Sequence, residues 1–299
     1  MRLAMKHARY ALAWVALACL PAVSQAAGDV AASTCYGVSR VIDPALPADV
    51  VARDMAALVA AAEQGSPYAA YLLGTLYRWG PAHPASRLPL DRALADQWLR
   101  RAALSGHLGA MAGLAENALV DGRTREALVI ALARVHYGKR SAAIGAMPGG
   151  RRFEHGLVDR AFAALGQPAT ESLQAELLAE VNAFVDAHGA GIESGLADAK
   201  TLNAGRDCPV SGEKERRPLE IRAVSSVLLE AERREGEAPQ HALFHLEVGA
   251  DGRVDRALLL DFSPGPEAVK PLQRAAEGML FNKLKGAPPR RALFPLTMH

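Results

Sequence analysis

Aromatic side chains are scarce in this 299-residue chain, since Phe, Trp and Tyr together make up 5% of it. Half of the residues are nevertheless hydrophobic, so the core has to be filled mainly by alanine and aliphatic side chains. Alanine has the highest helix propensity and allows helices to pack closely. The composition therefore favours closely packed helices over a β-sandwich.

Cysteine is also rare, with three residues in the whole chain, of which Cys19 lies in an N-terminal apolar run. The other two, Cys35 and Cys208, would form a disulfide most simply in an oxidising compartment. Such a bond would close a loop of about 170 residues and stabilise the fold through the unfolded state. Two free thiols or a metal-binding pair are the alternatives, but no further ligand motif lies near either cysteine. The sequence predicts neither a metal nor a cofactor.

No apolar run in the chain reaches the ~20 residues that span a bilayer. The longest, at 11–20, follows a basic segment and precedes small residues at Ser24 and Ala26. This order predicts a secretory signal peptide over residues 1–26, cleaved after Ala26. A retained membrane anchor and lipid attachment at Cys19 are the alternatives. We expect a mature protein that is exported to the periplasm and has no integral membrane span.

The chain lacks an excess of either charge, with a formal net charge of +2. Removal of residues 1–26 takes away three basic residues and no acidic ones, which changes the net charge to −1. The mature chain therefore has no overall basic field that would attract nucleic acid. We expect no nucleic-acid partner.

A repeat is present in the first half of the chain. The passage 61–69 returns at 102–110, which is 41 residues later, and Leu73 and Leu114 keep the same spacing. A period of this length is typical of stacked helix-turn-helix units, because one unit cannot bury its apolar face alone.

The repeated residues resemble the SEL-one-like repeat, a short relative of the tetratricopeptide repeat. The family pattern lies at Gly65, Ala69, Leu73, Gly74, Tyr77, Gly80, Asp91, Ala95, Trp98, Ala102, Ala103 and Gly106. The resemblance implies a short α-solenoid of helix-turn-helix repeats that binds proteins or peptides. Four side chains are expected to be exposed and to contact the partner: Tyr68, Tyr71, Arg78 and Arg100.

We expect an N-terminal arm over 27–48 and a helical repeat domain over 49–203 with degenerate C-terminal helices. One of these helices begins after Pro168 and is predicted to end at 188–189, where glycine follows histidine. A linker follows over 204–218.

The hydrophobic period changes from 3.6 to 2 beyond the linker. Two alternating segments at 242–248 and 254–262 flank the turn at 249–252, which predicts a β-hairpin. A helix at 267–279 and a final strand at 292–298 follow. The chain is thus predicted to be mainly α, with a small α/β domain over 219–299.

This C-terminal segment resembles the carboxy-terminal domain of TonB-family energy transducers. The resemblance rests on residues 246–254, Ser263 with Gly265, the helix at 267–279 and Phe281. It implies a small domain whose exposed sheet edge binds a strand or an envelope partner through backbone hydrogen bonds.

We do not expect an enzyme, because the sequence holds no His-Glu-x-x-His motif, nucleophile elbow or phosphate-binding loop. Ser211 and Lys214 have the Ser-x-x-Lys spacing, which leaves an enzyme as one hypothesis, but they lie in a charged linker. The expected function is an exported envelope scaffold that binds a protein or peptide through its repeats. The alternative is a TonB-like accessory that engages an outer-membrane receptor or transport component through the C-terminal domain.

Overall fold

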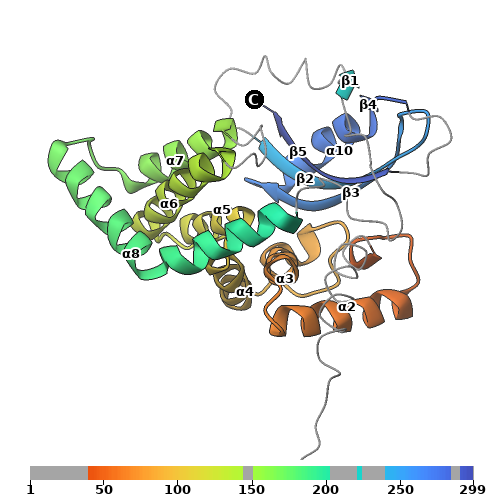
Figure 1. Ribbon diagram of the computed structural model, residues 1–299, viewed down its shortest axis with the longest axis horizontal. Helices are drawn as coiled ribbons and strands as arrows, with labels where there is room; N and C mark the ends of the chain where they lie inside the picture. The colour runs from red at the N-terminus through yellow and green to blue at the C-terminus, as the bar shows by residue number, and fades with distance from the viewer. Residues whose placement is uncertain (1–39, 144–150, 203–220, 224–239, 284–289, 299) are drawn as a thin grey trace, which may run out of the picture.

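The computed structural model describes residues 40–143, 151–202, 221–223, 240–283 and 290–298 (Figure 1). The predicted signal peptide and linker lie outside these residues. So do Cys35 and Cys208 of the predicted disulfide, and Ser211 and Lys214.

The described part is mostly helical and carries a small three-stranded antiparallel sheet at its C-terminal end, as the sequence predicts. The N-terminal helices are α2 (Ala48–Glu63), α3 (Pro67–Trp79), α4 (Arg92–Leu104), α5 (Leu108–Val120), α6 (Thr124–Ala143), α7 (Arg151–Leu165) and α8 (Glu171–Leu202), with a 3-10 turn η1 (Gly80–Ala82). From α2 to α7, each helix packs on the next one in chain order. No helix in the described part is both long and apolar enough to cross a membrane.

The 41-residue period reappears in the helix boundaries. α3 and α5 have 13 residues each, and they begin and end at positions one period apart. Each follows a glycine in the left-handed region, with φ of 96° at Gly65 and 84° at Gly106. Each is also capped by the residue after that glycine: Ser66 accepts the backbone N–H of Ala69, and His107 Nδ1 accepts that of Ala110. The sequence repeat is therefore a structural repeat.

Small residues bring the repeated helices together. A Cβ atom at Gly74 of α3 would lie 2.6 Å from Cγ of Leu99 on α4, and one at Gly113 of α5 would lie 3.1 Å from Cδ1 of the same leucine. Leu99 is fully buried. The leucine thus fills the space that two glycines leave, and α3, α4 and α5 share one core.

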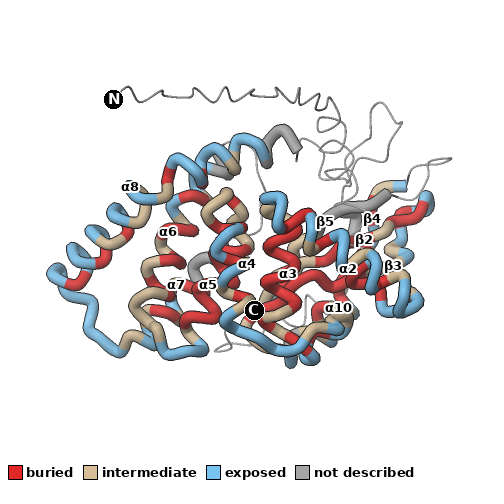
Figure 2. The backbone as a smooth tube through the Cα atoms, turned by 90° about the horizontal axis from the view of Figure 1, so that it is seen from below, coloured by how far each residue is buried: buried red, intermediate tan, exposed pale blue. Residues whose placement is uncertain are grey.

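The predicted end of the last helix is wrong, because α8 continues through His188 and Gly189 to Leu202. Its glycines are sites of close backbone approach rather than a helix stop. A Cβ at Gly195 would lie 1.9 Å from the carbonyl oxygen of Ser105, in the turn between α4 and α5. α8 therefore crosses the repeat at its turn while its outer side stays exposed (Figure 2).

The C-terminal part consists of β2 (Gln240–Val248), β3 (Val254–Ser263), a 3-10 turn η2 (Pro266–Ala268), α10 (Val269–Glu277) and β5 (Arg290–Met298). The strand order is β3-β2-β5, and the short strands β1 (Ile221–Ala223) and β4 (Leu280–Phe281) form a separate pair. The predicted hairpin, helix and strand are confirmed. α10 covers one face of the sheet and the helical layer covers the other (Figure 1).

A β-bulge in β3 determines which side chains face the helical layer. Leu243 of β2 pairs with Asp261, but its neighbour Phe244 pairs with Leu259, so Leu260 has no partner on β2. The even alternation expected at 254–262 is therefore interrupted. Leu258 and Leu260 join the helical core, whereas Phe262 joins the core under α10. Bulges commonly re-aim side chains in this way.

Equivalent glycines in the two repeat units give a matched test of the α8 crossing. Substitution of Gly65 by Ala should cost about 1 kcal/mol, because φ is positive but nothing lies within 4 Å of the added Cβ. Gly106→Ala should cost clearly more, since its Cβ would lie 2.7 Å from the carbonyl oxygen of Ile192 on α8. Urea unfolding of both variants measures the difference. Equal losses of stability in the two variants would contradict the packing of α8 against the turn at Gly106.

Candidate functional site

A buried carboxylate, Asp261 of β3, lies where the sheet meets the helical layer. The hydroxyl of Tyr71 on α3 donates to its Oδ2 at 2.7 Å, and the indole N–H of Trp79 donates to its Oδ1 at 3.2 Å. The backbone N–H of Phe262 also donates to Oδ1, at 2.8 Å. Three donors, two of them from one helix, therefore fix this carboxylate.

Arg78 supplies the positive charge beside Asp261. Its guanidinium nitrogen lies 3.7 Å from Oδ1 and donates to the carbonyl oxygen of Phe262 at 2.9 Å. The guanidinium also lies 4.5 Å from the ring centre of Trp79, and that ring stacks on Phe262 at 4.1 Å. Two consecutive residues of α3 thus hold two consecutive residues of β3, Asp261 by charge and Phe262 by hydrogen bonding and stacking.

The electrostatics keep Tyr71 as a donor. Burial first, and the neighbouring Asp261 carboxylate second, raise the pKa of Tyr71 well above its usual value. The phenol is therefore protonated throughout the physiological range, and it donates to Asp261 at every such pH.

The bulge in β3 is held by a histidine. His83, just after η1, accepts the backbone N–H of Ala85 at Nδ1 (3.2 Å), so its proton lies on Nε2. This Nε2 lies 3.2 Å from the carbonyl oxygen of Leu260 and donates to it. Burial lowers the pKa of His83, so the ring is neutral. It thereby satisfies a carbonyl of the residue that has no partner on β2.

A second polar contact joins the end of β3 to the later helices. Glu116 of α5 accepts hydrogen bonds from the hydroxyl of Ser263 and from Arg160 of α7. All three side chains are buried or partly buried. The charge of Glu116 is thus compensated by an arginine, and its second donor comes from the sheet.

The two contacts border a cavity of about 40 Å³ between Tyr71, Arg134, His241 and Ser263. A space of this size holds little more than one ordered water molecule. It is far smaller than the pockets of roughly 300 Å³ or more that bind small ligands. The geometry is that of an interface between two parts of a protein.

The structure separates the four residues that the sequence singled out as exposed. Tyr71 and Arg78 are buried under the sheet, so the expected exposure is wrong for both, because the chain's own β3 covers them. Tyr68 is partly buried, with its ring 6.4 Å from that of Tyr71. Arg100 is exposed, with 49% of its side chain accessible.

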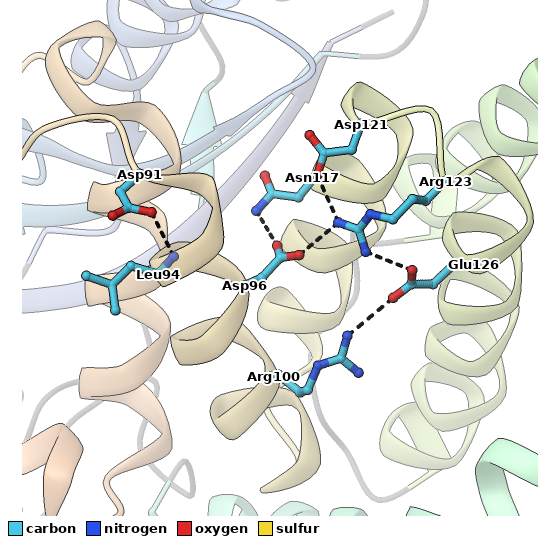
Figure 3. Close-up of polar contacts among 8 residues, drawn as sticks. All are labelled: Asp91, Leu94, Asp96, Arg100, Asn117, Asp121, Arg123 and Glu126. Atoms are coloured by element: carbon cyan, nitrogen blue, oxygen red, sulfur yellow. Dashed lines mark hydrogen bonds and ion pairs between the residues drawn. The ribbon is translucent and has the colours of Figure 1, made fainter.

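Arg100 belongs to a polar network on the outer side of α4, α5 and α6 (Figure 3). Its centre is Arg123, which binds Asp96 at 2.8 Å, Asp121 at 3.0 Å and Glu126 at 2.7 Å. Arg100 joins through Glu126 at 3.2 Å. Burial lowers the pKa of Arg123, but the hydrogen bonds that Arg123 donates to the three carboxylates outweigh it and raise the pKa above its usual value. The network ties neighbouring helices together on the solvent side.

Sequence reasoning did not identify Asp261, Trp79, His83 or Glu116 as site residues. One signal was available, namely the single carboxylate within the apolar run at 258–262. An acidic residue at a core position of a strand requires a partner. Nothing in the sequence showed that this partner would be Arg78, because the two are 183 positions apart.

Comparison with protein-family models found no match, and comparisons with curated proteins and with solved structures found none either. In the described part of the chain, no group of three or more His, Cys, Asp or Glu side chains is placed to hold a metal ion.

Loss of the charge at Asp261 should destabilise the whole molecule. Asp261→Asn keeps the size of the side chain but leaves Arg78, only 5% exposed, without its counter-charge. We expect a loss of about 2–4 kcal/mol in urea unfolding. Asp251→Asn, at a turn position where the side chain is 58% exposed, is the control and should change stability by less than ~0.5 kcal/mol. Similar losses of stability in the two variants would contradict a stabilising ion pair between Asp261 and Arg78.

Acidification should weaken the fold through the histidines near this interface. Burial lowers the pKa of His107 to about 4, from an unfolded value near 6.5. Below pH 6.5 the unfolded chain therefore binds more protons than the folded one, and stability falls as the pH decreases towards 4. Between pH 7 and pH 5, His107 should account for about 1–2 kcal/mol.

His107→Asn keeps a capping side chain and should remove this part of the pH dependence in urea unfolding. His136→Asn, at an exposed position of α6, should leave it unchanged. If the stability of the His107 variant changed with pH as much as that of the wild type, the assignment of this pH dependence to His107 would be wrong.

Proposed function

We propose that this chain is an exported envelope protein that acts as a scaffold for protein–protein interactions. Its helical layer is a short α-solenoid of SEL-one-like units, and its last segment is a small TonB-like domain. The observation that carries the proposal is the 41-residue structural repeat, in which α3 and α5 have the same length and each has a side-chain cap at the equivalent position. Stacked units of this kind provide an extended surface.

The first unit supports this role because it already holds a β-strand. Its contact residues are a tyrosine, an arginine and a tryptophan, the types that contribute most to binding at protein interfaces. One period later, the equivalents of Tyr71, Arg78 and Trp79 are Ala112, Leu119 and Val120. The second unit therefore lacks the equivalents of these three contacts, and its polar contact with β3 is a different one, from Ser263 to Glu116 of α5.

The side chain of Val120 remains available for a partner. It is 62% exposed at the position equivalent to Trp79, which is covered by Phe262 in the first unit. Arg100 also lies on the outer side of these helices. We therefore place the partner-binding surface on the second unit, around Val120 and Arg100.

The alternative is an accessory that engages an outer-membrane receptor or transport component through the C-terminal domain. One observation favours it: among the described strands, β5 pairs with β2 alone. A strand edge of this kind can accept a further strand through backbone hydrogen bonds.

Site-specific photo-crosslinking in intact cells separates the two proposals. A crosslinking residue at Val120 should capture a protein partner if the repeats are the scaffold, whereas Leu280, 38% exposed in the C-terminal domain, should not. Mass spectrometry identifies what is captured. Capture at Leu280 alone would favour the accessory, and the absence of a partner at both positions would contradict both proposals.

A further inference from the structure

A cleft of about 320 Å³ lies between β3, α10 and the segments that flank the first repeat unit. Its volume is at the lower end of the range for small-molecule sites. Aliphatic and proline side chains from four segments form the walls: Ile42, Pro44, Pro84, Ala85, Ala257, Leu258, Leu259 and Val269. The cleft is thus mostly apolar, and it is separate from the cavity at Asp261.

Two polar side chains in the walls, His83 and Gln273, already have hydrogen-bond partners within the protein. Both ring nitrogens of His83 are used, by Ala85 and Leu260. The amide nitrogen of Gln273 donates to the carbonyl oxygen of Ala257 and to Glu277, both at 2.8 Å. A polar ligand body would therefore gain few hydrogen bonds here, whereas an apolar one would displace water from apolar walls.

Two positive charges lie at the edge of the cleft. Lys270 and Arg274 are one helical turn apart on α10, line the cleft and are exposed. Within the described part of the chain, neither makes an ion pair. The carboxylate of Asp43, in the neighbouring segment, is bound by Arg256. The edge of the cleft is thus cationic and its walls are apolar.

We propose that this cleft binds one monomeric amphiphile with a carboxylate headgroup, such as a medium-chain fatty acid. The alkyl chain occupies the space between β3 and Pro84, and the carboxylate lies between Lys270 and Arg274. A charged donor pair and an apolar wall together select this class of ligand over neutral or cationic amphiphiles. The inference does not depend on the scaffold function, since the cleft lies in a different place from Val120 and Arg100.

Isothermal titration calorimetry on the full mature chain tests the site. Decanoate below its micelle concentration should bind with one-to-one stoichiometry, 1-decanol more weakly, and decyltrimethylammonium most weakly. Vesicles of phosphatidylglycerol test whether the charges bind a membrane surface instead. Absence of decanoate binding, equal affinity for the cationic amphiphile, or binding of vesicles alone would overturn the proposal.

Two variants locate the ligand. Lys270→Gln with Arg274→Gln should weaken decanoate binding about tenfold or more and leave 1-decanol binding unchanged. Because both side chains are exposed, this variant should keep the wild-type stability. The control is Arg101→Gln with Lys139→Gln, which makes the same charge change at exposed positions of α4 and α6.

Ala85→Phe fills the cleft and should abolish binding of both decanoate and 1-decanol. A decanoate affinity that is the same in the Lys270/Arg274 variant and its control would refute the assigned headgroup position, whether or not the Ala85 variant folds.

Discussion

The buried ion pair between Asp261 and Arg78 is the contact on which the arrangement of the two parts depends. A guanidinium keeps its charge when buried, so Arg78 cannot be covered by an apolar sheet without a counter-charge. Asp261 likewise requires donors, and Tyr71 and Trp79 supply them. If one partner were removed, the other charge would stay buried without compensation. The stability lost in this way is far larger than the net stability that the pair contributes. The helical layer and the sheet are therefore expected to fold as one unit.

Backbone irregularities make this pairing possible. The bulge at Leu260 brings Asp261 towards α3 and leaves a carbonyl that His83 satisfies. Glycines allow the helices beneath to approach closely, since Gly74 and Gly113 both make room for Leu99. The same repeat carries different side chains in its two units, and Trp79 is matched by Val120. The first unit can thus hold the sheet through Trp79, while Val120 at the end of the second unit stays exposed to solvent.

Local patterns in the sequence predicted the local structure well. The 41-residue period fixed the position of α3 relative to α5, and the alternation at 242–248 located β2. The predictions from sequence were wrong where contacts between distant parts of the chain determine the structure. The glycine at 189 predicts a helix end, but α8 continues to Leu202 because it packs against the turn at Ser105. Tyr71 and Arg78 were expected at the surface, since no local signal reveals that a strand nearly two hundred residues later will cover them.

Hydrogen–deuterium exchange of the mature chain tests the central claim most directly, because it measures the opening free energy of each element separately. If the buried pair joins the two parts, the most protected amides of α3 and those of β2 and β3 should open together, with the same free energy and the same dependence on denaturant. A sheet whose amides exchange through an independent opening, while α3 stays protected, would contradict this account.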